Sequence, residues 1–399
     1  MMKKFLAVIG LVFTFFFPSL LTFFVQDDFW LLSISHIKTA GDFFNFFIPL
    51  SDAVWYRPLS SQVFFFIGRT VFGLNPLPYH VVVLITHIGT SFILYKWIKK
   101  MTNNEQVSMF SALVYGTHQV HTISLSWLAA YSFVLGPFFL ALTLFFFTSK
   151  KYVLAFFAYL LGLLSSEVLI ITPLILLLYF LIYKKNTSIK FVLLFIFSAV
   201  LLVLLRFYFF PSQQNTPLYS VTFSSHIFET IKFYFLRLIG VPLFINGMDP
   251  GLKLFVSGLS VILFVGTLIG FVRNRSRVSK QVVLWFGIYL LAIAPFLLLP
   301  FHVSPHYLSF ALIGAAPLFS YYLLLASSIR LKKAYLMIAI GSFLLLNFAG
   351  TQWVYQTHWV FRRADIAKQL ILHKNFIYPP GSEEYFSLGA NAASKVFER

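Results

Sequence analysis

Two adjacent carboxylates, Asp27 and Asp28, directly follow the first long apolar run of a chain that has only 12 acidic residues. Each carboxylate opposes the ionisation of the other, so a segment that ends at a membrane surface gains no stability from the pair. The two acids either mark a helix exit at the surface or include an active-site base that faces a loop. The rest of the sequence has to decide between these alternatives.

Arg57 is the first cation that could act with the acid pair. It lies in the segment Tyr56-Arg57-Pro58-Leu59-Ser60, where the tyrosine and the proline predict a turn. A guanidinium held in a turn is well suited to bind a phosphate, although a purely structural role is the alternative. Other polar residues at or near the ends of apolar runs are informative because such positions are energetically costly. They are His80, His87, His118, His121, Glu167, His302 and His306.

These residues also have simpler interpretations. His118 and His121 are spaced i and i+3, as a metal pair could be, but no carboxylate ligand accompanies them and no metal or other cofactor is assigned. His80 and His87 lie a heptad apart on one helix face, and we expect them to form hydrogen bonds between helices. Glu167 either belongs to the site or pins a tight turn.

The composition places these residues in a membrane protein. Of the 399 residues, 59% are apolar, 20% are aromatic and only 11% are charged, and the mean hydropathy is +0.85. A soluble domain cannot bury so much apolar surface. The apolar runs lack the period of two that strands show, so the sequence predicts an all-α polytopic protein rather than a barrel. The net charge of +18 comes mainly from residues that flank the apolar runs, so no nucleic-acid partner is expected.

Eleven membrane spans are expected. The first is a retained N-terminal span, because its apolar stretch is too long for a signal peptide and has no small-residue cleavage site before Asp27. The spans lie near residues 5–25, 78–98, 106–122, 129–148, 152–166, 167–183, 190–210, 252–272, 281–300, 307–328 and 334–350.

The basic residues predict the orientation of these spans. With the N-terminus inside, five basic clusters fall on the inner side, as the positive-inside rule requires. Segment 224–246 must then be an outer-surface or re-entrant helix, which puts the C-terminus outside and leaves Glu105 as the only acid on the inner side. The clusters are Lys96/Lys99/Lys100, Lys150/Lys151, Lys184/Lys185/Lys190, Arg273/Arg275/Arg277/Lys280 and Arg330/Lys332/Lys333.

This layout gives one transmembrane domain, residues 1–350, and a short outer tail, residues 351–399, too small for its own core. Outer loops are expected at 26–77 and 211–251. In the first loop, residues 61–72 are too short to cross and predict an amphipathic helix in the interface. Its cluster Phe64-Phe65-Phe66 is expected to contact lipid.

The order of the polar motifs resembles the GT-C class of polytopic glycosyltransferases, and in particular the transmembrane O-mannosyltransferases with tetratricopeptide tails. The resemblance covers the first half of the chain well and the second half thinly, and it depends on the ordered series rather than on one motif. The matching segments are Asp27-Asp28, Arg57-Pro58-Leu59-Ser60, Gly73-Leu74-Asn75-Pro76, Tyr79-His80, His118-Gln119-Val120-His121-Thr122, Leu164-Ser165-Ser166-Glu167 and His306-Tyr307-Leu308.

Several positions depart from the family pattern. Ile123 replaces the acid after the second histidine, which weakens any metal-dependent mechanism. Ser166 and His306 replace a lysine and an arginine, and Gln119 replaces a proline. With those two cations lost, Arg57, with Arg206 or Arg237 as further options, is left to bind a lipid phosphate. The tetratricopeptide tail is absent from this sequence.

The resemblance implies a multi-pass plasma-membrane enzyme that takes a sugar from a polyprenyl-phosphate donor. The acceptor hydroxyl, on a protein, a glycan or a lipid, arrives from the outer side. Asp27 or Asp28 would be the catalytic base, with Asp27 favoured by the family pattern, and Arg57 would stabilise the departing phosphate. The residues that would orient the substrate or bind the lipid phosphate are His118, His121, Glu167 and His306.

Two other functions remain as alternatives. A lipid-linked oligosaccharide polymerase or ligase also has many spans and large outer loops, but typically depends on arginine and histidine rather than on an acid pair after the first span. A transporter or flippase predicts two related halves with broken helices and ionisable residues at mid-membrane. The sequence shows no such symmetry.

Overall fold

The computed structural model describes residues 2–37, 39–49, 55–184, 189–209, 223–274, 279–326 and 332–372, and these residues are helical with no strand among them. Some residues discussed above lie outside this description. They are Lys185, Arg275, Arg277, Arg330, the side chain of Arg206, residues 210–222 of the second outer loop and residues 373–399 of the tail.

Seven of the described helices are long and apolar enough to cross a membrane, which needs about 20 residues. This number makes the chain a multi-pass membrane protein with a lipid bilayer as its surroundings. The seven are Lys4–Leu21, in α1 (Met2–Phe16) and the 3-10 turn η1 (Phe17–Leu21); α5 (Pro76–Thr102); Leu128–Thr148, in η4 (Leu128–Ala130) and α8 (Ser132–Thr148); α13 (Pro250–Arg273); α14 (Lys280–Leu297); Pro305–Leu325, in η10 (Pro305–Tyr307) and α15 (Leu308–Ala326); and Ala334–Thr357, in α16 (Lys332–Thr357).

The four remaining expected spans also coincide with helices, and three of these helices are shorter. The four are α6 (Glu105–Thr117), α9 (Tyr152–Leu163), α10 (Thr172–Tyr183), which follows η5 (Glu167–Ile171), and α11 (Ile189–Phe209). The first three have only 13, 12 and 12 residues. α11 has 21 residues, and its apolar stretch Ile189–Leu205 is one of the shorter ones. Length and composition of the described residues therefore give seven candidate spans.

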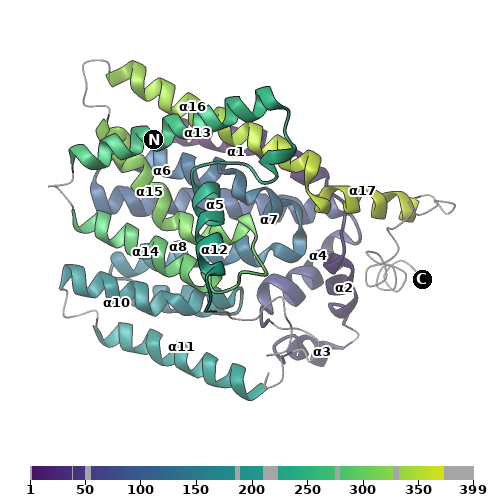
Figure 1. Cartoon of the computed structure of the whole chain (residues 1–399). Helices are drawn as coiled ribbons and strands as arrows, with labels where there is room; N and C mark the ends of the chain where they lie inside the picture. The colour runs from purple at the N-terminus through teal and green to yellow at the C-terminus, as the bar shows by residue number, and fades with distance from the viewer. Residues whose placement is uncertain are drawn as a thin grey trace.

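Short helices gather at one end of the bundle. In Figure 1, α2 (Asp27–Ile34), α3 (Ala40–Asn45), α4 (Phe64–Phe72) and the C-terminal helix α17 (Trp359–Leu372) lie beyond the same end of the long helices. One turn of π-helix, η2 (Leu59–Val63), precedes α4, and η3 (Gln119–His121) and α7 (Thr122–Ser126) link α6 to η4 (Leu128–Ala130). This end carries the acid pair.

Hydrogen bonds between distant segments close this end. The hydroxyl of Ser19, in η1, lies 2.7 Å from the hydroxyl of Ser126, in α7, and 2.7 Å from that of Tyr355, in α16. The amide of Leu59 donates to the carbonyl of Leu164 at 3.0 Å. These contacts join the ends of helices that the expected span order places on one side of the membrane.

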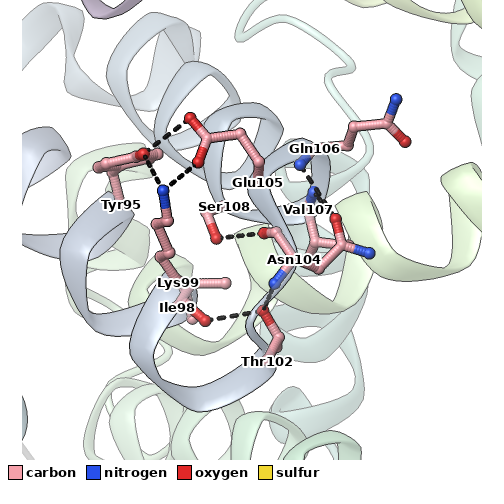
Figure 2. Close-up of polar contacts among 9 residues, drawn as sticks. All are labelled: Tyr95, Ile98, Lys99, Thr102, Asn104, Glu105, Gln106, Val107 and Ser108. Carbon is pink, nitrogen blue, oxygen red and sulfur yellow. Dashed lines mark hydrogen bonds and ion pairs between the residues drawn. The ribbon is translucent and has the colours of Figure 1, made fainter. Parts of the chain in front are cut away.

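The opposite end carries lysine residues. Gln281, at the start of α14, donates to the carbonyl of Met101 at the end of α5 at 3.1 Å, and Lys280 lies over the ring of Tyr183 at the end of α10. Figure 2 shows the α5–α6 turn at this end, where Lys99 forms an ion pair with Glu105. The one acid expected on the basic side therefore pairs with a lysine of that side.

Helix α12 (His226–Leu238) corresponds to the segment expected at the outer surface. Its 13 residues are too few to cross a bilayer, and in Figure 1 it runs across the direction of the long helices. Its last turn is fixed to the bundle, because His118 Nε2 lies 3.2 Å from the carbonyl oxygen of Leu238 and the side-chain amide of Gln119 donates to the carbonyl of Gly240.

The structure corrects one expectation about packing. Phe64 and Phe65 are buried in the protein core, against Tyr79 and, for Phe64, Tyr131, so they do not contact lipid as expected. An apolar cluster alone cannot distinguish lipid from a protein core, because both are equally apolar.

Candidate functional site

The two neighbouring acids have different environments. The carboxylate of Asp28 is fully buried, and it accepts hydrogen bonds from the amide of Val25 at 2.9 Å and from that of Ala129 at 2.7 Å. Asp28 thereby fastens the start of α2 to η4, 101 residues later. Burial raises its pKa well above the usual range, against the effect of these amides. Both of its oxygens therefore accept hydrogen bonds that stabilise the fold.

Asp27 is the accessible member of the pair. It is exposed, but the surrounding protein desolvates its carboxylate and raises its pKa, while the positive charge of Arg363 lowers it. Arg363 comes from α17 and donates a hydrogen bond to the side-chain oxygen of Gln26, the residue before Asp27. Asp27 is therefore a carboxylate that solvent can reach, held beside a cation from the other end of the chain.

Gln26 has a backbone conformation that is uncommon for a residue other than glycine, with φ of 48° and ψ of −106°. Such a conformation costs about 1–3 kcal/mol and persists only where the surroundings impose it. Asp28 binds the amide of Val25 on one side of Gln26, and Arg363 binds its side chain. Both contacts fix the direction in which the chain turns into Asp27.

Arg57 and Glu167 form an ion pair in which the arginine Nε lies 2.8 Å from the glutamate Oε2. The other carboxylate oxygen of Glu167 accepts from the amide of Tyr56 at 2.7 Å, and Arg57 Nη1 donates to the hydroxyl of Ser132 at 3.1 Å. Glu167 thus fastens the segment that contains Arg57 to η5. These bonds do not involve the tight turn in which Glu167 itself lies. The guanidinium also lies over the rings of Trp55 and Phe133.

His306 approaches Arg57 through the ring of Phe133. The Phe133 ring centroid is 5.4 Å from the guanidinium carbon and 4.7 Å from the imidazole centroid of His306. The neighbouring His302 is bonded to the hydroxyl of Tyr307, and burial together with the charge of Arg57 lowers the pKa of His302. Three expected site residues, Arg57, Glu167 and His306, therefore form one cluster.

His118 and His121 lie elsewhere. Both are buried, and the His121 ring packs 4.4 Å from that of His87 and 4.8 Å from that of Tyr115. His121 Nδ1 lies 3.2 Å from the hydroxyl of Ser309 in α15. The partners of the two histidines lie on α5, α6, α12 and α15, so this pair is not brought to Asp27 or to Arg57.

The expected structural role of His80 and His87 is confirmed. His80 Nδ1 lies 3.1 Å from the carbonyl oxygen of Leu125, and His87 Nε2 lies 2.9 Å from that of Gly116. Both bonds join α5 to the neighbouring helix segments. Within the described ranges, no group of three histidine, cysteine, aspartate or glutamate residues is placed to hold a metal ion.

The structure adds residues of α17 that sequence reasoning missed. Trp359 packs against Trp127 at 5.3 Å between ring centroids, and the Arg363 guanidinium lies 4.6 Å from the Trp359 centroid. The burial of the preceding His358 lowers the pKa of its imidazole to about 4, so the ring is neutral at pH 7. The only sequence signal was a short amphipathic pattern of tryptophan, arginine and apolar residues after the last span.

No protein-family model matches the sequence, and no curated protein matches it either. The candidate site is therefore defined by its own residues, with Asp27 and Arg363 on one side and the Arg57–Glu167 cluster on the other.

Proposed function

We propose that the protein is a GT-C-like glycosyltransferase that moves a sugar from a polyprenyl-phosphate donor to an acceptor hydroxyl on the outer side of the membrane. The observation that carries the proposal is the division of the acid pair. Asp28 has both oxygens bound to backbone amides, while Asp27 reaches solvent on α2, which packs against η2, the turn that follows Arg57. This arrangement supports one catalytic base and one structural acid.

Asp27 is the proposed base. As the acceptor oxygen forms its bond with the anomeric carbon of the sugar, the carboxylate of Asp27 takes the hydroxyl proton. The bond between that carbon and the phosphate oxygen breaks, and its electron pair leaves with the polyprenyl phosphate. Desolvation raises the pKa of Asp27 and so strengthens it as a base, while Arg363 keeps the ionised form accessible near neutral pH.

Arg57 takes a different role from the one expected of it. Its charge is balanced by Glu167, and it also donates a hydrogen bond to Ser132. A guanidinium that is already paired with a carboxylate is a weaker ligand for a departing phosphate. We assign the Arg57–Glu167 pair to holding the loop of residues 55–60 in place beside the site.

We also propose the full topology of eleven spans with the N-terminus inside and the C-terminus outside. Helices α6, α9, α10 and α11 would cross together with the seven candidate spans. Support comes from the hydrogen bonds that join the ends of the helices in the order expected and from the lysines gathered at the opposite end. Asp27 would then lie on the outer face.

The test is sugar transfer in membranes that contain the chain. Polyprenyl-phosphate mannose with a radiolabelled sugar, and then the same lipid carrying glucose, are supplied and labelled products are counted. Asp27→Asn should reduce the rate about 10²–10⁴-fold, the usual contribution of a general base. Asp365→Asn, an exposed acid on α17, is the control and should leave the rate unchanged.

Two results would contradict the proposal. One is full transfer activity in Asp27→Asn, which would exclude Asp27 as the catalytic base. The other is absence of transfer in the wild-type chain together with flux of the lipid-linked sugar across sealed vesicles, which would indicate a transporter or flippase. Comparison of surface glycans in cells with and without the protein identifies the acceptor class.

A further inference from the structure

A cavity of about 550 Å³ lies between α6 and α12–α16, and its walls are almost wholly apolar. Protein interiors are close-packed and contain few voids larger than one water molecule. An apolar space of this size between helices is therefore suited to hydrocarbon.

The cavity is elongated along the helices. On α15 its lining runs from Leu312 to Tyr322, which is about 15 Å at 1.5 Å per residue. One end reaches Leu238 and His118, near the end that carries the acid pair, and the other reaches Phe271, two residues before the basic end of α13. This shape suits one extended chain rather than a compact ligand.

Most polar side chains of the wall are bonded within the protein. His118 is bonded to the carbonyl of Leu238, and the hydroxyl of Thr267 donates to the carbonyl of Leu263. The side chain of Asn347 accepts from the backbone amide of Gln119 and donates to the carbonyl of Phe343. The wall also includes the hydroxyls of Tyr289 and Tyr322, but it has no lysine or arginine. An anionic headgroup finds no opposite charge along this wall, so the head of the ligand must lie beyond one end of the cavity.

Arg237 lies at that end. It is the residue before Leu238 on α12, and it lines a small second cavity together with Gln119, Ile123 and Val354. Its Nη1 donates to the carbonyls of Val241 and Pro242 at 2.9 Å each, and its buried Nε has no hydrogen-bond partner. Burial lowers the pKa of Arg237 to about 10, so the guanidinium stays charged at pH 7.

No carboxylate balances Arg237 among the described residues, in contrast to Arg57. A partly buried cation with an unused donor and no counter-ion favours an anionic ligand, and a guanidinium suits phosphate in particular. The small cavity has a volume of about 10 Å³, which is room for about one water molecule. Two of its lining residues, Ile123 and Val354, pack in one cluster with Val25, two residues before Asp27.

We propose that the apolar cavity holds the hydrocarbon chain of a single-chain phospholipid-like ligand and that Arg237 binds its phosphate. The choice of a polyprenyl phosphate as this ligand rests on the function proposed above. Arg237 then takes the part of the two cations that are replaced by Ser166 and His306 in this sequence. The head would lie on the path from the cavity to Asp27.

Binding to the purified full-length chain in detergent tests the proposal. The probes are polyprenyl phosphate, the uncharged polyprenol of the same length, a two-chain phosphatidic acid and inorganic phosphate. Polyprenyl phosphate should bind at least tenfold more tightly than each of the others. Equal binding of the polyprenol would refute the phosphate contact, and equal binding of phosphatidic acid or inorganic phosphate would refute the single-chain cavity.

Matched variants locate the site. Thr267→Trp fills the cavity and should weaken polyprenyl phosphate binding at least tenfold, and Ala315→Leu, which also faces the cavity, serves as a second variant if the first does not fold. Val265→Trp, on the outer side of the same helix, should have no effect. Wild-type affinity in both cavity variants would overturn the proposal.

The charge is tested in the same way. Arg237→Met should reduce the affinity for polyprenyl phosphate to that for polyprenol, and Arg237→Lys should retain part of the difference. Lys232→Met removes an exposed cation of the same helix and should change nothing. An unchanged preference for the phosphate in Arg237→Met would refute the role of Arg237. Asp27→Asn should bind the lipid normally, so loss of transfer and loss of binding are separate results.

Discussion

Arg57 and Glu167 are 110 positions apart in the chain and form an ion pair with 2.8 Å between Nε and Oε2. Each side chain is 21% exposed, so water screens the pair only in part. The same carboxylate accepts the amide of Tyr56. One glutamate at the start of η5 therefore holds both the backbone and the charged side chain of the loop before η2.

Replacing this glutamate should loosen that loop. Glu167→Gln keeps one acceptor but leaves Arg57 without its counter-ion, and a hydrogen bond to a charged group contributes about 1.5–3 kcal/mol. We expect a lower melting temperature in detergent and faster proteolysis between residues 50 and 60. Glu229→Gln, which removes an exposed pair with Lys232, is the control, and equal effects of the two changes would contradict the structural role of Glu167.

Replacing Asp28 should destabilise the protein more than replacing the adjacent Asp27. Asp28→Ala leaves the amides of Val25 and Ala129 without an acceptor, at roughly 1–3 kcal/mol for each buried amide. Asp27→Ala removes an exposed side chain and should hardly change the melting temperature. Thermal unfolding of both variants in the same detergent measures this, and a larger loss in Asp27→Ala would show that the assignment is inverted.

Removal of Arg363 should move the acidic limb of the pH–rate profile for sugar transfer to higher pH. Asp27 is active as a carboxylate, and the positive charge of Arg363 lowers its pKa. Without that charge the pKa rises, so protonation inactivates the base at a higher pH. The rate profile of Arg363→Gln between pH 4 and pH 8 measures the shift. Arg362→Gln, an exposed neighbour, should leave the profile in place, and an unmoved limb in Arg363→Gln would exclude the interaction.

The proposed topology can be tested with single cysteines, because the natural sequence contains none. A cysteine at Lys232, which is exposed on α12, should react with a membrane-impermeant maleimide in intact cells. A cysteine at Gln106, exposed beside the α5–α6 turn shown in Figure 2, should react only after the membrane is opened. Labelling of both in intact cells would contradict the orientation.

The sequence by itself determined that this protein is helical and lies in a membrane. Apolar run length and the charges between runs are local properties, and helices in hydrocarbon satisfy their own backbone. The positions of the expected spans therefore coincide with helices throughout the described chain. The sequence also singled out Asp27, Asp28 and Arg57, because charged residues at the ends of apolar runs are energetically costly and stand out.

Only the tertiary structure decided what these residues can do. Asp27 and Asp28 are equivalent by type and position, and they differ because Val25 and Ala129 enclose one carboxylate. Arg57 meets Glu167, and Arg363 reaches Gln26, only through packing of helices far apart in the chain. His118 and His121 could not be placed from spacing, since burial against Tyr115 and Leu238 depends on neighbouring helices. Partners more than 100 residues apart leave no local pattern, so the fold has to supply them.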